Sequence, residues 1–202
     1  MDSERFDLLN SAGEPTGETK PRREVHRDGD WHRSFHLWIV KDNEYVLLQR
    51  RAKTKDLEPD KADVTVGGHY RAGETLIDVV REVEEEVGLF VRSEALHHLA
   101  TQKAERVYVN AVDREFQEVY VLKNDQPLDH YYLDCAEVSV LYELHIDKAL
   151  ALYRDGGFAP VSGWDCQQRV NNALLLEGDL IQQARRDVVA ALELIKEWLE
   201  TK

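Results

Sequence analysis

The sequence predicts a mixed α/β domain with a helical C-terminal extension, and three observations favour this class. Short runs rich in aromatic and β-branched residues recur through the first 125 residues, as expected for strands. A helix-forming segment at 76–87 interrupts them. From residue 141 onward the apolar residues recur at helical spacing instead. The 202 residues suffice for one domain with an added segment.

The strand-like runs share alternation or enrichment in Val, Ile, Leu, Tyr, Phe and Trp. In chain order they are 4–9, 34–40, 45–51, 62–68, 107–113 and 116–125. An Asp-Asn turn separates the second run from the third, so these two predict a β-hairpin. The fourth run ends in two glycines and leads into the helix at 76–87.

Two more helices are expected near the C-terminus. Residues 141–153 carry leucines at helical spacing, and Gly156 and Gly157 end that pattern. Residues 178–200 predict a long amphipathic helix that starts at Asp179. We therefore expect a domain over 1–155 and a helical extension over 156–202, which either packs on the domain or forms a homodimer contact.

Composition restricts the class of partner. A chain that is 43% hydrophobic with a net charge of −13 is expected to be soluble and to avoid nucleic acid and anionic membranes. Two cysteines without a CxxC pair predict no disulfide framework and no structural zinc. The N-terminus lacks a signal-peptide pattern, and no apolar run reaches about 18 residues. A cytoplasmic protein is expected.

Residues 81–88, REVEEEVG, place four carboxylates within five positions. At about 100° per residue, Glu82, Glu85 and Glu86 share one arc of a helix, whereas Glu84 points away. Like charges at this spacing repel, and the arc has no lysine four residues on. A solvated acidic face is the ordinary interpretation of such a run. A divalent cation such as Mg²⁺ or Mn²⁺ would instead relieve the repulsion directly.

The segment from Gly68 to Glu74, followed by Arg81 to Leu89, resembles the Nudix box, Gly-x5-Glu-x7-Arg-Glu-U-x-Glu-Glu-x-Gly-U, where U is apolar. Every fixed residue type is present. The spacing departs once, because six residues instead of seven separate Glu74 from Arg81. The resemblance implies a Nudix-type α/β/α sandwich around a mixed sheet and metal-dependent cleavage of a nucleoside diphosphate linked to another group.

The resemblance also implies roles for individual residues. Glu82, Glu85 and Glu86 would bind Mg²⁺ or Mn²⁺ with help from the Gly68 carbonyl. Arg81 would orient these carboxylates, and Glu74 would support the arginine. The metal ions would hold the diphosphate and lower the pKa of the attacking water. Glu118 is our candidate for a further catalytic acid from outside the box, although an exposed strand glutamate is the alternative.

The segments before the box, REVHRDGDWHRSFHLWIV and LLQRRAKTKDLEPDKADVTVGGH, resemble the Nudix subgroup that contains isopentenyl-diphosphate isomerase and related hydrolases. With the box, this resemblance covers roughly residues 4–125. It implies a second metal site at His26, His32 and His69, with Glu118 near one carboxylate position. Imidazoles with a carboxylate suit Mn²⁺ or Zn²⁺. Surface or strand histidines without a metal are the alternative.

The isomerase of this subgroup uses a cysteine two residues before the histidine of the Gly-His segment, where this chain has Gly67. A hydrolase is therefore favoured over an isomerase, and a non-catalytic nucleotide-binding module is the third possibility. The substrate is expected to be a small-molecule diphosphate. Arg50, Arg51 and Lys55 are candidates to contact its phosphates, with the balance of local acidic charges as the alternative. Tyr70 is a candidate to stack on a base, with packing in the core as the alternative.

Overall fold

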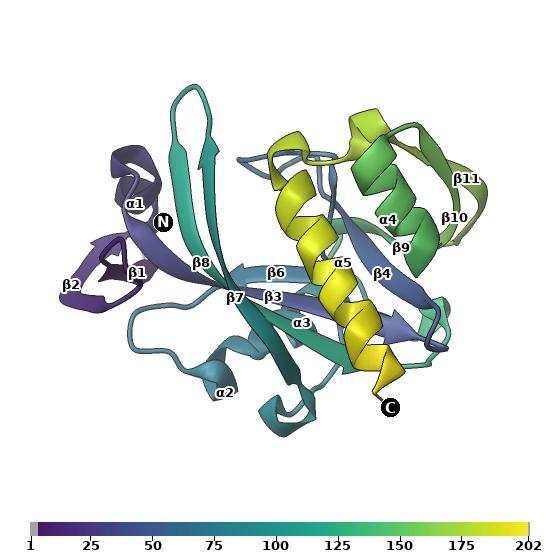
Figure 1. Cartoon of the computed structure of the whole chain (residues 1–202), viewed down its shortest axis with the longest axis horizontal. Coiled ribbons are helices and arrows are strands. Elements are labelled where there is room, and N and C mark those ends of the chain that lie inside the picture. The colour runs from purple at the N-terminus through teal and green to yellow at the C-terminus, as the bar shows by residue number, and fades with distance from the viewer. Residues whose placement is uncertain (1–3, 202) are drawn as a thin grey trace.

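The structure is a computed structural model that describes residues 4–201 (Figure 1). Residues 1–3 and 202, which belong to the expected segments 1–155 and 156–202, lie outside the described part. The strands are β1 (Arg5–Leu9), β2 (Pro15–Pro21), β3 (Trp31–Lys41), β4 (Tyr45–Arg51), β5 (Ala62–Asp63), β6 (Val66–His69), β7 (His97–Val107), β8 (Val112–Lys123), β9 (Val138–His145), β10 (Phe158–Asp165) and β11 (Arg169–Leu176). The α-helices are α1 (Arg22–Asp28), α2 (Leu76–Val79), α3 (Arg81–Val87), α4 (Ile146–Asp155) and α5 (Arg185–Glu200).

All described strands belong to one mixed sheet, and β3 lies at its centre. It pairs in parallel with β8 along nearly its whole length and antiparallel with β1, β4 and β6. On the other side of β4 the sheet continues through β9, β10 and β11. Residues far apart in the sequence therefore meet on the strands that flank β3.

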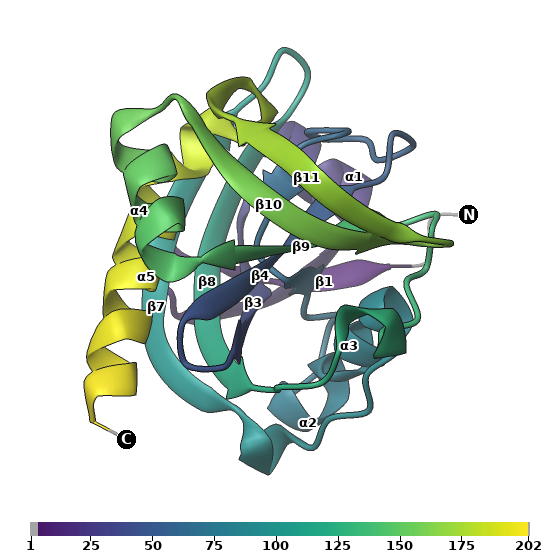
Figure 2. The same ribbon diagram turned by 90° about the vertical axis from the view of Figure 1, so that its right-hand side faces the viewer.

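Helices cover both faces of this sheet, as Figure 2 shows. On β3, Trp38 and Val40 pack in a core with α4 and α5, whereas Leu37 and Ile39 pack in a second core with α3. This alternation follows from the two-residue repeat of a strand whose two faces are both buried. The expected α/β/α sandwich around a mixed sheet is confirmed.

Several expected elements have different bounds. The expected helix at 76–87 is two short helices that meet at Val80. The expected strand at 107–113 covers the turn between β7 and β8, and β7 was not predicted. β7 pairs only with β8, so most of its residues are exposed and its sequence is polar.

The C-terminal third departs most from the expectation. Residues 138–145 form strand β9, which pairs with β4 on one edge and with β10 on the other, and the helix begins only at Ile146. The first part of the expected helical extension is the β10–β11 hairpin, which extends the same sheet. α5 begins at Arg185 instead of Asp179 and packs with α4 on the sheet.

The expected absence of a disulfide is wrong, because Cys135 and Cys166 are bonded to each other. The fold brings the segment before β9 next to the turn between β10 and β11, a proximity that the spacing of 31 residues does not reveal. Among the helices of residues 4–201, none is long and apolar enough to cross a membrane.

Candidate functional site

The glutamate-rich segment forms α3, which begins after the break at Val80. Thr75 starts the preceding turn, where its backbone N–H donates to Asp78 at 2.9 Å. Gly88 ends α3 with a φ of 66°, and a Cβ there would lie 2.6 Å from Tyr132. Glycine satisfies both demands, since it tolerates a positive φ and close approach.

Arg81 connects the acidic groups of the box. Its Nε donates to Glu74 Oε1 at 3.0 Å, and its Nη1 donates to Glu82 Oε1 at 2.5 Å and to Glu85 Oε2 at 2.9 Å. Glu74 therefore supports the arginine despite the shorter spacing. The shorter spacing coincides with the break between α2 and α3 at Val80.

Glu82 packs directly on the backbone of β6. A Cβ at Gly68 would lie 2.6 Å from the Cγ and Cδ atoms of Glu82, so only glycine permits this approach. Burial raises the pKa of Glu82. The structure thus brings Gly68 and Glu82 together, as the resemblance implies for a shared metal site.

Glu86 is buried and accepts a hydrogen bond from Gln49 Nε2 at 3.1 Å. Burial raises its pKa to about 8, against the opposing charge of Lys55. Glu85 differs, since about half of its side chain is exposed. Glu84 is exposed as well, as expected for the glutamate that points away. A divalent cation beside Glu86 would compensate its buried charge.

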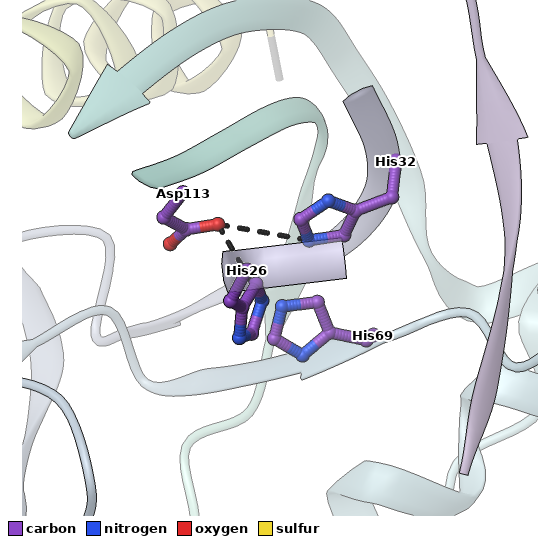
Figure 3. A group of neighbouring side chains, drawn as sticks. All are labelled: His26, His32, His69 and Asp113. Atoms are coloured by element: carbon purple, nitrogen blue, oxygen red, sulfur yellow. Dashed lines mark ion pairs between the residues drawn. The ribbon is translucent and has the colours of Figure 1, made fainter. Parts of the chain in front are cut away.

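The three predicted histidines meet on the opposite face of the sheet. His26 comes from α1, His32 from β3 and His69 from β6, and Asp113 of β8 completes the group (Figure 3). His69 follows Gly68 on β6, so the two residues point to opposite faces. β6 therefore separates the box glutamates from this group, which we call the histidine cluster.

The ligand-type atoms of the histidine cluster all lie within 4.8 Å of one another. The Nε2 atoms of His26 and His32 are 3.7 and 3.6 Å from Asp113 Oδ1. These three atoms and His69 Nε2 are buried without a hydrogen-bond partner. Burying such atoms unpaired costs about 1–3 kcal/mol each. Three imidazole nitrogens and a carboxylate oxygen fit a divalent transition metal.

Burial also sets the protonation of this cluster. It lowers the pKa of His26 to about 4 and lowers that of His32, so both rings are neutral near pH 7. It raises the pKa of Asp113, helped by the charge of Glu115. Neutral imidazoles are the form that binds metals. The neutral imidazoles thus match the metal-site interpretation, whereas a bound cation would have to displace the proton that burial favours on Asp113.

Glu115 stands beside the cluster, two residues after Asp113 on β8. Its Oε1 lies 3.2 Å from His69 Nε2. Burial opposes its ionisation, but the His69 ring and the Arg106 guanidinium hold its pKa well below the usual range. We did not predict Asp113 and Glu115. The Asp-x-Glu spacing, with both side chains on one strand face, was the signal that could have indicated them.

A cleft of about 900 Å³ opens onto this face. His26, His69, Asp113 and Glu115 line it together with Gly67 and Gly68. Its walls carry charges of both signs. The cationic side chains are Arg22, Arg23, Arg27, Arg51, Lys55 and Arg106, and the acidic ones are Glu4, Asp56, Glu58, Asp63, Asp113, Glu115 and Glu137. The guanidinium and ammonium groups are suited to an anionic ligand, and the carboxylates to a cation.

Two predicted substrate-binding residues line this cleft, and two do not. Arg51 and Lys55 line it. Arg50 instead pairs with Asp60 at 2.7 Å and with Asp179 at 3.4 Å. Tyr70 is buried in the core with α3, below the Arg33 guanidinium. Alternation on β4 turns Arg50 and Arg51 to opposite faces, which explains why only one of them reaches the cleft.

Glu118 does not join the histidine cluster. It accepts hydrogen bonds from His98 Nε2 and Thr101 Oγ1, both at 2.9 Å. Glu118 is separated from Asp113 and from Glu115 by an odd number of positions along β8, so its side chain points to the other face of the sheet. Asp113 supplies the carboxylate of the cluster, near which we had expected Glu118.

Comparison with protein families supports the box assignment. The model of the NUDIX domain matches residues 30–155, more than half of the chain. The chain belongs to the Nudix family. Its matched region contains the box, His32, His69, Asp113 and Glu115, whereas His26 precedes it.

Relatives of known sequence are similar over most of this Nudix chain. An uncharacterized Nudix hydrolase of Clostridium acetobutylicum is 34% identical over 158 residues, 77% of this chain and 76% of that protein. Nudix hydrolase 3 of Arabidopsis thaliana is 40% identical over 147 residues. That alignment covers 70% of this chain but only 19% of the Arabidopsis protein.

Solved structures support the fold. DR0079 of Deinococcus radiodurans aligns with a TM-score of 0.54 at 24% identity, covering 73% of this chain and 87% of that one. The MutT protein of Methanosarcina mazei aligns with a TM-score of 0.55 at 17% identity, over 85% and 96%. At these identities the likeness concerns the fold.

Proposed function

We propose that this Nudix protein is a metal-dependent hydrolase that cleaves a diphosphate linkage in a small molecule, such as a nucleoside diphosphate linked to another group, by attack of water. The observation that carries the proposal is the position of Gly68 and His69. These neighbours on β6 touch the box glutamate Glu82 on one face and the histidine cluster on the other. Both also line the cleft with its six cationic side chains.

The cleft residues would bind the phosphates. Arg51 stands on one wall, where Asp63 holds its Nη1 at 3.2 Å, and Lys55 pairs with Glu137 beside it. Arg23 on α1 is exposed and lines the cleft as well. Guanidinium groups bind phosphate oxygens through parallel hydrogen bonds, and an ammonium adds a compact charge. These residues would orient a diphosphate above the histidine cluster.

Two sets of residues would hold the metal ions. Glu82, Glu85 and Glu86, with the Gly68 carbonyl, offer the oxygen ligands that Mg²⁺ or Mn²⁺ prefer. The histidine cluster offers nitrogen ligands and suits Mn²⁺ or Zn²⁺. Bound metal supplies charge neutralisation to the phosphates and acidifies water. Arg81 keeps the box carboxylates oriented through its contacts with Glu74, Glu82 and Glu85.

The isomerase alternative is disfavoured by the cysteines as well as by Gly67. Gly67 lines the cleft and has no side chain that could transfer a proton. Cys135 and Cys166 are bonded to each other, and neither lines the cleft. The chain therefore offers no thiol at the position that the isomerisation requires.

A substrate panel tests the proposal. Purified protein is incubated with Mg²⁺ or Mn²⁺ and nucleotide sugars, ADP-ribose, dinucleoside polyphosphates, coenzyme A derivatives or nucleoside triphosphates. We expect release of phosphate-containing products from at least one class. No product from any class, while a reference Nudix enzyme is active, would contradict hydrolysis. Tight binding without turnover would instead favour a nucleotide-binding module, and isopentenyl diphosphate should not be isomerised.

The remaining expectations are also proposals. The charge of the chain favours a small-molecule partner over nucleic acid or membrane. The cytoplasmic location stays a proposal, and the Cys135–Cys166 disulfide argues against it, since such bonds are rare in the cytosol. Sedimentation at several concentrations would show whether the protein forms a homodimer.

A further inference from the structure

Arg106, at the end of β7, lies behind the histidine cluster, and neither the box nor the predicted substrate contacts involve it. Its side chain is only 11% exposed. Its Nη1 donates to Glu115 Oε2 at 3.1 Å and lies 3.9 Å from Asp113 Oδ2. A buried guanidinium between two carboxylates could simply neutralise them. The atoms that it contacts indicate a more specific role.

Each carboxylate divides its two oxygens between the cluster and Arg106. Asp113 turns Oδ1 to His26 and His32 and Oδ2 to Arg106. Glu115 turns Oε1 to His69 and Oε2 to Arg106. The arginine therefore contacts the oxygens that face away from the three cluster histidines. One of these oxygens, Glu115 Oε2, also lies 3.9 Å from Nε2 of a fourth histidine, His36. Gln117 strengthens this arrangement, because its Nε2 donates to Glu115 Oε2 at 2.7 Å.

The far side of Arg106 faces the C-terminal helix. Its Nη2 lies 3.9 Å from Asp187 Oδ2 in the first turn of α5. Three hydrogen bonds hold this end of the helix on β7. Gln102 Nε2 donates to the Asp187 carbonyl at 3.1 Å, and the side chain of Gln183 exchanges bonds with the backbone of Val107 at 2.9 and 3.1 Å. Asp187 is thus fixed beside the guanidinium.

We propose that Arg106 is a positioning residue that turns one oxygen each of Asp113 and Glu115 toward the histidine cluster, and that Asp187 of α5 holds Arg106 in place. This inference rests on the proposed metal-binding role of the cluster. It gives the C-terminal helix a direct part in the site. Outer partners of this kind orient ligands, and their loss typically lowers metal affinity about 10- to 100-fold.

The deciding variant is Arg106→Lys, because lysine keeps the positive charge but lacks the planar fork that reaches three carboxylates. Co²⁺ is the probe, since its visible absorption distinguishes a nitrogen-rich site from an octahedral oxygen site. We expect the Co²⁺ dissociation constant to rise by about tenfold or more, with an altered absorption band. Wild-type affinity together with a wild-type spectrum would overturn the positioning role.

A second variant protects the test against misfolding. Asp187→Asn keeps the shape of the side chain but removes the charge that holds Arg106. We expect the Co²⁺ dissociation constant to rise less than in Arg106→Lys, and the Co²⁺ absorption band to shift. Glu193→Gln is the matched control on α5, because Glu193 is half exposed and pairs with Arg154. It should leave Co²⁺ binding unchanged. An Asp187→Asn protein identical to the control would contradict the anchoring role.

These outcomes separate the inference from the proposed function. If wild-type protein binds Co²⁺ at the cluster but hydrolyses no diphosphate, the positioning role stands and the hydrolase proposal fails. If wild-type protein shows no nitrogen-bound Co²⁺, the metal site and the positioning role fail together, whereas hydrolysis through the box alone is still measured by the substrate panel.

Discussion

The box helix and the histidine cluster lie on opposite faces of β6, and they differ in how their charges are satisfied. The box is one contiguous stretch, and its own Arg81 pairs with Glu74, Glu82 and Glu85. The cluster is assembled from α1, β3, β6 and β8. Four of its buried polar atoms have no hydrogen-bond partner.

This difference shows that a segment with a recognisable sequence motif is not necessarily the segment whose structure most requires a bound ligand. Within the box, Arg81 is a cation shared by three carboxylates, and Glu86 accepts a hydrogen bond from Gln49. The cluster keeps unpaired polar atoms in a buried position, at a cost of about 1–3 kcal/mol each. A metal ion would recover this cost. The cluster therefore indicates a cation more strongly than the box, although the box is easier to recognise.

The largest expected effect tests the box. Glu85→Gln removes one carboxylate that would act on the diphosphate and should lower kcat by about 100- to 1,000-fold, as for loss of one electrostatic contact to a transition state. Glu84→Gln is the matched control, because Glu84 is exposed on the same helix and points away. Steady-state kinetics on the best substrate measures both. Equal rates for the two variants would show that the box carboxylates do not act in catalysis.

The next test concerns the cluster. His69→Gln removes one nitrogen ligand and should weaken Co²⁺ or Mn²⁺ binding at the cluster by about 100-fold, since loss of an outer partner alone costs 10- to 100-fold. The thermal shift on adding metal should decrease accordingly. His98→Gln serves as control, because His98 contacts Glu118 outside the cluster. If both variants bind metal like wild type, the cluster is a structural feature only.

The pH dependence of Mg²⁺ binding sharpens the contrast. Burial raises the pKa of Glu86 to about 8, so the metal-free carboxyl is protonated below that pH. Mg²⁺ must displace this proton, and its affinity should fall up to about tenfold for each pH unit below 8 and level off above it. Calorimetry in buffers of different ionisation enthalpy measures the protons that are released when Mg²⁺ binds. The His69→Gln variant is used because its weakened cluster leaves the box as the main metal site. Adding Glu86→Gln should abolish the proton release; an unchanged release would assign the proton to another group.

The smallest functional effect is expected from the disulfide. Cys135–Cys166 closes a loop of about 31 residues. Its removal in a Cys135→Ser/Cys166→Ser double variant should lower the free energy of unfolding by about 3 kcal/mol. The neighbouring backbone N–H groups of Tyr132 and Asp134 donate to carbonyls at the end of α3, so Mg²⁺ binding at the box should weaken slightly. Chemical denaturation and calorimetric titration with Mg²⁺ measure the two effects. Co²⁺ titration is the control, and weaker Co²⁺ binding at the cluster would contradict this assignment.

Local patterns predicted the central elements well. The hairpin of β3 and β4 follows from apolar runs around a turn, and the box helix follows from its apolar stripe and Gly88. β7 and β9 were missed for opposite reasons. β7 is an exposed strand with a polar sequence, and β9 is buried on both faces, so its leucines imitate helical spacing over a short window.

The parts of the site that lie in one short segment of the sequence were easier to predict than the parts that come from several elements. The sequence by itself determined the box, the family and all three cluster histidines, because spacing and resemblance act on residues within short segments of the chain. Only the tertiary structure decided that Asp113 and Glu115 join the cluster, that Glu118 and Arg50 face elsewhere, and that α5 reaches Arg106. Strand alternation assigns a side chain to one of two faces, but the pairing of β3 with β6 and β8 decides which side chains meet.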